Sequence, residues 1–415
     1  MACHEFFFKF FDPFGSPIAE YENVLSVDLA RSENTVGIMQ MRLAGCDIDD
    51  LGILLRPDLR CEVWHKPPGG NLRLDGDTVW LLRKWVHSWD RNSRETELYF
   101  YDAMHLITRR IVAWYATENP QSPSHMGGDG AVGAGNDTRL MLWRVMQYNF
   151  GEWVDNYTGD PNVTVPGVIP PAAGGPGTAL PFTSIRRQMD LLDTMAPWGT
   201  SGVGSTHEMA WANCLDVLQQ IGEDTEAQGV PLIFDVVYDP TTQGLRFQTW
   251  ANLRGSDRST SQVFSPDNQN VYNFQEVHDW ENTAEWAYVG GADDGTGQRL
   301  VVGVVDQSRQ FLTPYGMAEV FVDGGDLTDQ AAMEAEGRAA LWRYRPKVLF
   351  TGSAQDTAQS VFGRDYFYGD RVGVSGTIDA TARIRRYGIT IRNNQSEIDI
   401  PLDSDDNVMD IISSR

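Results

Sequence analysis

The stretch LRKWVHSWDRNSRETELYF, residues 82–100, contains a basic and aromatic run, a polar turn and a second alternating run. A similar stretch, IRRYGITIRNNQSEIDIPL, occupies residues 384–402, at a constant offset of 302 positions and without a gap. The matching residues are Arg83 with Arg385, Lys84 with Arg386, Trp85 with Tyr387, Asn92 with Asn394, Glu95 with Glu397, and Glu97 with Asp399. Alternation around a polar turn is typical of β-hairpins. The pattern predicts one hairpin unit used twice, with shared turn chemistry as the alternative explanation.

The pattern of the first 115 residues predicts β-structure. Phe6, Phe8 and Phe10 alternate with their neighbours, as one buried face of a strand requires. Later aromatic and β-branched runs are separated by turn-forming residues at 67–70 (PPGG) and 90–93 (DRNS). This meander predicts a small barrel or sandwich.

Four later segments place apolar residues at helical spacing, and short apolar runs between them predict strands. The expected helices cover 102–115, 139–151, 211–227 and 328–344. The expected strands cover 232–238, 245–250, 283–290, 299–306 and 366–402.

The fold class that follows is α+β and mostly β, with several domains. Two similar barrel-like modules near the termini would flank an inserted α+β section. The predicted division is 1–115 (first β domain), 116–260 and 261–350 (α+β domains), 351–402 (closing strands of the second β domain) and 403–415 (tail). Pro- and Gly-rich segments at 119–137 and 159–181 predict loops.

Composition and charge exclude several classes of protein. The 57 acidic residues outnumber the 33 Lys and Arg residues, which gives a formal charge of −24. Specific nucleic-acid binding is not expected, because it requires clustered cations. An apolar run long enough to span a bilayer is missing from the sequence, so no membrane segment is predicted. The first 15 residues lack the order of a signal peptide, which predicts a chain made and used without secretion.

Motifs that suggest chemistry are weak here. GDGAVG (128–133) follows no predicted strand, so it reads as a loop. THEMAWANC (206–214) lacks the second histidine of a zinc site, and Thr206 reads as a helix cap. Four scattered cysteines predict reduced thiols: Cys3, Cys46, Cys61 and Cys214. Acidic clusters at 47–50, 293–294 and 403–406 read as solvated charge.

We therefore predict no catalytic residue, no cofactor and no metal. A peptidoglycan hydrolase is the alternative from the enzyme class, with Glu208 or Glu223 as weak candidates. A cell-wall carbohydrate-binding module is the other alternative, because the 13 tryptophans offer faces for stacking on sugars.

Several blocks carry a family resemblance. YFYGDRVGVSGTIDATARIRRYGITI (366–391) resembles the closing segment of the tail-hub proteins of long-tailed bacteriophages. Blocks at 73–85, 213–239 and 313–323 are similar to other parts of that family. The resemblance implies a non-enzymatic virion protein at the tail tip, made in the host cytoplasm. It also implies a homotrimer whose neighbours are the distal tail, tape-measure and tip or receptor-binding proteins.

The duplication suggests how such a ring would assemble. Three copies on a threefold axis present six similar units, which suit docking on a sixfold tube. DNA would pass through the lumen, and acidic walls would repel its phosphates. The candidate assembly-interface residues are Arg83, Lys84, Trp85, Arg385, Arg386 and Tyr387.

Overall fold

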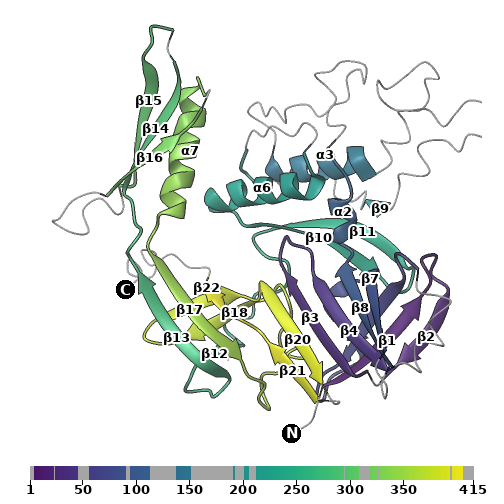
Figure 1. The fold of residues 1–415 in the computed structure, drawn as a ribbon. Coiled ribbons are helices and arrows are strands. Elements are labelled where there is room, and N and C mark those ends of the chain that lie inside the picture. The colour runs from purple at the N-terminus through teal and green to yellow at the C-terminus, as the bar shows by residue number, and fades with distance from the viewer. Residues whose placement is uncertain are drawn as a thin grey trace, which may run out of the picture.

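The computed structural model describes most of the chain, and the fold is mostly β with several sheets (Figure 1). The described residues are 4–22, 24–44, 56–89, 94–112, 137–150, 190–191, 201–204, 212–293, 295–307, 318–325, 327–392 and 395–404. The loop at 159–181, the GDGAVG segment, Thr206, the cluster at 47–50 and the tail from 405 lie outside them. No helix in the described part is long and apolar enough to cross a membrane.

One large antiparallel sheet dominates the fold. Its order is β2-β1-β5-β7-β8-β4-β3-β20-β21, and β6 pairs with β5. The strands are β1 (Glu5–Phe11), β2 (Pro17–Tyr21), β3 (Ser26–Ser32), β4 (Ile38–Ala44), β5 (Arg60–Lys66), β6 (Arg73–Leu74), β7 (Trp80–Trp89), β8 (Arg94–Asp102), β20 (Arg386–Arg392) and β21 (Gln395–Asp399). The sheet therefore joins the two ends of the chain.

The period of two in the sequence explains how these strands pack. Phe6, Phe8 and Phe10 are buried on one face of β1, as predicted. Ile389 and Ile391, from the other end of the chain, belong to the same hydrophobic core. Full burial of one such side chain stabilises the fold by roughly 1.5–3 kcal/mol, so the two ends hold each other in place.

Both predicted hairpins are confirmed, and they share one pairing register. β7 pairs with β8 as Trp89↔Arg94, Ser88↔Glu95, His87↔Thr96 and Val86↔Glu97. β20 pairs with β21 as Ile391↔Ser396, Thr390↔Glu397, Ile389↔Ile398 and Gly388↔Asp399. Each pair in the second hairpin lies 302 positions after its counterpart in the first. The sequence match thus corresponds to a match in backbone pairing.

The placement of the second hairpin differs from the expectation. β20 pairs with β3 through Ile389↔Leu29 and its neighbours, so the hairpin extends the N-terminal sheet. β4 pairs with one edge of β3, and β20 pairs with the other edge and adds its apolar residues to the same core. Residues 351–402 are consequently shared between sheets, while the domain division otherwise stays a prediction.

A helical layer lies over a small sheet beside the large one. It contains α2 (His105–Thr108), α3 (Thr138–Phe150), α6 (Cys214–Ala227), β9 (Asp190–Leu191), β10 (Leu232–Asp239) and β11 (Gly244–Ala251). Asn213 caps the start of α6, because its side chain accepts a hydrogen bond from the Leu215 amide at 2.9 Å. Cys61 and Cys214 are buried thiols outside any disulfide, as expected.

The helix expected at 102–115 is wrong in length, because β8 continues to Asp102 and α2 has only four residues. The backbone beyond α2 turns away from helical pairing. Ile111 bridges to Asn213, and the Val112 amide donates to the Ala212 carbonyl at 2.8 Å. This extended pairing positions the start of α6 and competes successfully with the local helical pattern.

The remaining strands form smaller sheets. β12 (Val263–Phe264), β18 (Arg371–Ser375), β19 (Asp379–Arg383) and β22 (Asp403–Ser404) form one sheet, and β13 (Val271–Asp279) pairs with β17 (Lys347–Ala354). A third sheet contains β14 (Trp286–Asp293), β15 (Arg299–Val305) and β16 (Glu319–Asp323), with α7 (Gln330–Arg343) against it. Figure 1 shows this outer unit extending beyond the β13–β17 ribbon.

Gly337 explains why α7 approaches its sheet so closely. A Cβ atom at this position would lie 2.6 Å from Val304 Cγ2. Only glycine therefore allows this helix to contact the strands at this distance, and Ala340 and Leu341 then pack against Ala287.

A buried arginine links the large sheet to the helical layer. Arg31 on β3 donates from Nε to Asp102 Oδ2 at 3.0 Å and from Nη2 to Asp235 Oδ1 at 2.9 Å. Arg254 also bonds Asp235, at 2.8 Å. Burial acts to lower the pKa of Arg31, but the two aspartates raise it well above its ordinary value. The guanidinium is therefore charged and satisfied by groups from β8 and β10.

We expect Arg31→Met to destabilise the fold by about 3–5 kcal/mol, because it leaves two aspartates buried without this partner. Chemical denaturation followed by circular dichroism measures the loss. Arg392→Met is the matched control, since Arg392 is exposed and lies 3.5 Å from Asp28. Equal stability of the two variants would contradict the structural role of Arg31.

The pH dependence of stability tests the same cluster. Burial raises the pKa of Asp102 to about 6, against the opposing effect of Arg31. A raised folded-state pKa contributes stability at low pH that is lost as the pH rises through about 6. Asp102→Asn cannot ionise, so its thermal midpoint should rise relative to the wild type between about pH 4 and about pH 7. A difference between the two proteins that stays constant over this pH range would contradict this.

Candidate assembly surfaces

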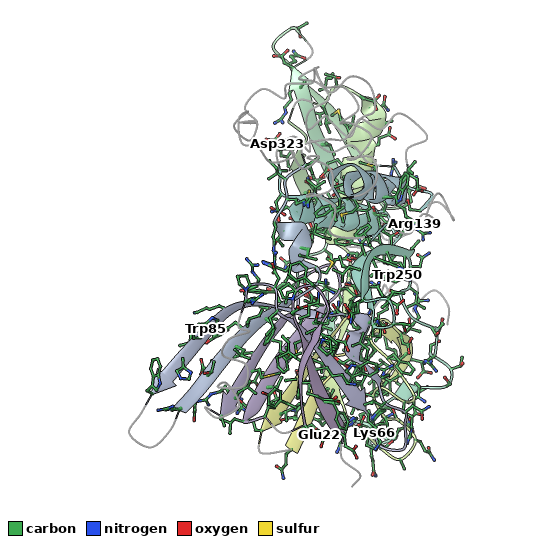
Figure 2. The ribbon with its side chains drawn as sticks, turned by 90° about the vertical axis from the view of Figure 1, so that its right-hand side faces the viewer. Glu22, Lys66, Trp85, Arg139, Trp250 and Asp323 are labelled. Atoms are coloured by element: carbon green, nitrogen blue, oxygen red, sulfur yellow. The ribbon has the colours of Figure 1, made fainter. Side chains whose placement is uncertain are left out.

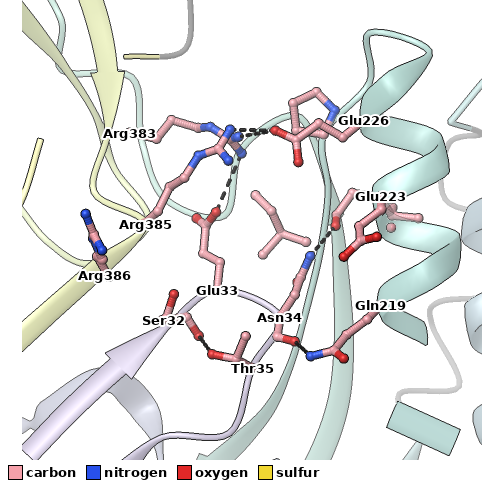
Figure 3. Close-up of a pocket in the computed structure, with 14 residues that line it drawn as sticks. Ser32, Glu33, Asn34, Thr35, Gln219, Glu223, Glu226, Arg383, Arg385 and Arg386 are labelled. Carbon is pink, nitrogen blue, oxygen red and sulfur yellow. Dashed lines mark hydrogen bonds and ion pairs between the residues drawn. The ribbon is translucent and has the colours of Figure 1, made fainter. Parts of the chain in front are cut away.

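A polar pocket lies between the start of β20, the end of β3 and helix α6 (Figure 3). Its volume is about 440 Å³. Arg383 at the end of β19 and Arg385 just before β20 line it from one side. Glu33 and Asn34 come from the turn after β3, and Glu226 comes from α6. Three parts of the chain that are distant in sequence thus meet around one cavity.

Ion pairs and amide hydrogen bonds hold the walls of this pocket together. Glu226 accepts from Arg385 Nη2 at 2.6 Å and from Arg383 Nη2 at 3.3 Å. The Asn34 side chain donates to the Leu232 carbonyl at 2.9 Å and accepts from the Phe234 amide at 2.8 Å. The pocket is therefore a junction between the large sheet and the helical layer, lined mainly by charged and neutral polar residues.

The predicted interface residues occupy different environments. Arg83 bonds Asp58 at 2.8 Å, and the Lys84 ammonium lies 4.9 Å from the centre of the Tyr99 ring. Trp85 is half-exposed, and Figure 2 shows it on the part of the sheet that extends away from the body. All three residues belong to β7 and are exposed to solvent.

The second triplet divides between surface and core. Arg385 and the exposed Arg386 line the polar pocket, whereas Tyr387 is buried and donates to Asp75 Oδ2 at 2.6 Å. The structure corrects the prediction that Tyr387 lies at an interface, because the alternation along β20 turns its side chain toward the core with that of Ile389. The structure does not bring the two triplets together, since β8, β4 and β3 separate β7 from β20.

The outer end of the β7–β8 hairpin presents an open edge. β5 pairs with β7 only at Trp80 and Leu81, so within the described residues the rest of β7 has no strand on that side. Trp89 is 71% exposed and meets the His87 ring edge-on at 4.4 Å. Exposed aromatic residues beside an open strand edge are typical of a surface that another chain covers.

The outer sheet presents a second exposed apolar surface. α7 covers one face, while Tyr288, Val301 and Phe321 are exposed, Phe321 to 58%. Tyr288 pairs directly with Phe321 in the parallel β14–β16 register, so the two side chains lie on the same face of the sheet. The runs RLVVGVV and EVFVD are apolar at both odd and even positions. That pattern is the signal from which this surface could have been predicted.

Comparison with solved structures shows that other proteins share this fold. The prophage MuSo2 43 kDa tail protein from Shewanella oneidensis is similar, with 11% identity, a TM-score of 0.54, and coverage of 96% of this chain and 98% of that chain. The tail protein from Neisseria meningitidis MC58 has 13% identity, a TM-score of 0.51 and 98% coverage of both chains. A chain of the lidless PdpA–VgrG complex has 8% identity and a TM-score of 0.52, covering 97% of this chain and 65% of that one. These similarities establish a tail-protein fold.

The family follows from the sequence. Residues 83–402, well over half of the chain, match the family described as Siphovirus ReqiPepy6 Gp37-like protein, and the chain belongs to this family of phage tail proteins. A comparison with curated proteins finds no match.

The polar pocket yields a test of its role as a junction. Glu226→Gln removes the charge that pairs with Arg383 and Arg385, and we expect it to cost about 1–3 kcal/mol of unfolding free energy. Glu223→Gln, in the same pocket wall and on the same helix, should cost less than about 0.5 kcal/mol. Equal losses measured by chemical denaturation would contradict a specific role for Glu226.

Proposed function

We propose that this tail protein is a trimeric hub at the tail tip, which joins a sixfold tail tube to the tip and forms the channel for DNA ejection. The observation that carries the proposal is the repeated hairpin. Two units with the same register within one chain give six similar units in a trimer, and this resolves a mismatch between threefold and sixfold symmetry. Membership of a family of phage tail proteins supports a location in the phage tail.

The exposed surfaces support an assembled state. The open edge of β7 and the apolar face of β14–β16 would both be covered when copies or neighbouring tail proteins pack against them. Arg83, Lys84, Trp85, Arg385 and Arg386 are the proposed contact residues. The proposed neighbours are the distal tail, tape-measure and tip or receptor-binding proteins.

The charge of the chain supports a passive channel. A formal charge of −24 disfavours adhesion of DNA phosphates to the wall, so the polymer would move through without being held. The proposed work is mechanical and needs no catalytic residue.

A cryo-EM reconstruction of the virion that carries this chain tests the proposal directly. We expect three copies below the sixfold tube, with residues 82–100 and 384–402 in quasi-equivalent positions. An off-axis location, or another copy number, would overturn the hub assignment.

Surface variants test the proposed contacts. We expect the double variant Lys84→Glu, Trp85→Ala to weaken trimer formation by about tenfold or more in mass photometry, because exposed aromatic residues often carry the binding energy of interfaces. Trp280→Ala is the control, since Trp280 is similarly exposed but lies after β13. Unchanged assembly of the double variant would remove the β7 surface from the interface.

Purified cell-wall sacculi separate the hub from its alternatives. Release of soluble fragments would indicate a peptidoglycan hydrolase, and co-sedimentation without fragments would indicate a carbohydrate-binding module. The hub proposal predicts neither result.

A further inference from the structure

A small pocket with aromatic walls lies where the large sheet meets the segments that follow β11 and precede β18. Its volume is about 290 Å³. Trp250 of β11, Phe367 and Tyr368 supply the aromatic walls, and Arg73 of β6 and Arg254 supply positive charge. This aromatic pocket is distinct from the polar pocket beside α6, because the two share no residue.

Both arginines lie over aromatic rings. The Cζ atom of Arg73 is 4.2 Å from the centre of the Phe367 ring. The Cζ atom of Arg254 is 4.6 Å from the centre of the Tyr368 ring and 5.3 Å from that of Trp250. A guanidinium attracted to the face of an aromatic ring keeps the N–H groups at its edge available for an acceptor. The rings therefore hold two guanidinium groups at the pocket wall without using their N–H donors.

The two arginines differ in their other partners. Arg254 forms an ion pair with Asp235 at 2.8 Å. In the part of the chain that the structure describes, the side chain of Arg73 forms no ion pair and donates no hydrogen bond, and its Nε is buried without an acceptor. A buried N–H donor without an acceptor destabilises a fold, so such a group normally has a partner. Arg73 is therefore the group in this pocket that a ligand with an acceptor atom would satisfy.

The charge of Arg73 is compensated only from beyond ion-pair distance. Burial lowers the pKa of Arg73, and Asp75, Asp77 and Asp370 act in the opposite direction. An arginine nevertheless stays charged at ordinary pH. Asp75 compensates this charge weakly, because burial raises the pKa of its carboxyl and its Oδ2 atom already accepts from Tyr387. An anion at the guanidinium edge would therefore stabilise Arg73.

Two acidic residues also line the pocket, and they are not equivalent. Asp370 is buried, and its carboxylate accepts from Arg258 Nε at 2.7 Å and from the Ser256 amide at 2.7 Å. The side chain of Asp77 is 70% exposed and lies 4.0 Å from Arg254. Asp77 can therefore turn toward water, but its charge still opposes that of an anion in the pocket. This balance favours a singly charged ligand over a phosphate, which carries up to about two charges near neutral pH.

The size and the walls of the pocket restrict the ligand further. A volume of about 290 Å³ is at the lower end of the range for small-molecule sites, so the pocket holds a short group and not a polymer. Two N–H groups of a guanidinium fit the two oxygens of a carboxylate. The aromatic rings exclude water from a short aliphatic chain that carries such a group. These properties match the end of a glutamate side chain or a small aliphatic acid.

We propose that the aromatic pocket is a carboxylate-binding site, in which Arg73 binds the carboxylate while Arg254, Phe367 and Tyr368 form the walls. The carboxylate comes from an acidic side chain of another polypeptide or from a free aliphatic acid, and the chemistry that Arg73 recognises is the same in both. Binding supplies the acceptor that the buried Nε lacks. This function is additional to the proposed hub role and does not depend on it.

Nuclear magnetic resonance of the full chain, labelled with ¹⁵N-arginine, tests the site through the Nε–H signal of Arg73. The Arg73→Lys variant identifies this signal by its loss, and butyrate at constant ionic strength is the probe. We expect a saturable shift with a Kd of about 10 mM or below, as suits a ligand of so few atoms. The signal of exposed Arg392 is the internal control and should not shift. No saturable shift of Arg73, or an equal shift of Arg392, would overturn the proposal.

Further probes identify the source of the carboxylate. A blocked tripeptide with a central glutamate presents the side chain of a polypeptide, and the same peptide with a central glutamine is its neutral match. Tighter binding of the glutamate peptide than of butyrate would assign the site to an acidic side chain, and the reverse order would assign it to a free acid. Binding of the glutamine peptide as tightly as the glutamate peptide, or of inorganic phosphate more tightly than both carboxylates, would overturn the proposal.

Arg73→Gln tests the residue that binds the carboxylate. The indole N–H signal of Trp250, which lines the pocket, reports occupancy in this variant. We expect the affinity for butyrate to fall at least about tenfold, because a charge-assisted pair of hydrogen bonds is lost. Arg338→Gln is the control at an exposed position of α7 and should leave the affinity unchanged. Equal affinities of the two variants would overturn the role of Arg73.

Asp77→Asn should have the opposite effect. It removes a like charge from the pocket, so the Kd for butyrate should fall by about threefold. Asp77 adopts φ +52°, and asparagine tolerates this left-handed conformation, so the variant should fold like the wild type. This variant keeps the test decisive even if Arg73→Gln does not fold. An unchanged or weaker affinity for butyrate would contradict the proposal.

Discussion

The buried charge of Arg31 is the constraint on which much of this fold depends. A guanidinium enclosed in a core is tolerated only when carboxylates surround it, and here they come from β8 and β10. The large sheet and the helical layer must therefore dock in one relative position for the charges to be satisfied. Arg254, which follows β11, forms a further ion pair with Asp235. Residues of β3, β8 and β10 and of the segment after β11 therefore belong to one buried cluster of charges.

A consequence is that the first and last parts of the chain form one structural unit. β20 pairs with the edge of β3, β21 pairs with β20, and buried Tyr387 donates a hydrogen bond to Asp75. The outer unit of β14–β16 and α7 is connected to this body through the β13–β17 ribbon, and α7 also contacts α6. Such an arrangement combines a stable body with surfaces that extend outward, which suits a protein that works within a larger assembly.

Local patterns predicted most of the regular elements. The period of two in β1, the helical spacing of α6, and the strands expected at 232–238 and 245–250 all correspond to observed elements. The patterns failed where a distant segment competed for the same backbone groups. The residues after α2 pair with those before α6, so the predicted helix ends early. Tyr387 was assigned to an interface from its match with Trp85, whereas its alternation with Ile389 and Ile391 along β20 places it in the core.

The sequence by itself determined the repeated hairpin, the mostly β character and the acidic balance, because each depends on neighbouring residues or on composition. Only the tertiary structure decided that both hairpins share one sheet, that Arg31 meets Asp102 and Asp235, and that His4 meets His65 and Asp356. The physical reason is that strand order and buried polar contacts join residues up to several hundred positions apart. Their energies depend on which surfaces exclude water together, and no local pattern in the chain encodes that choice.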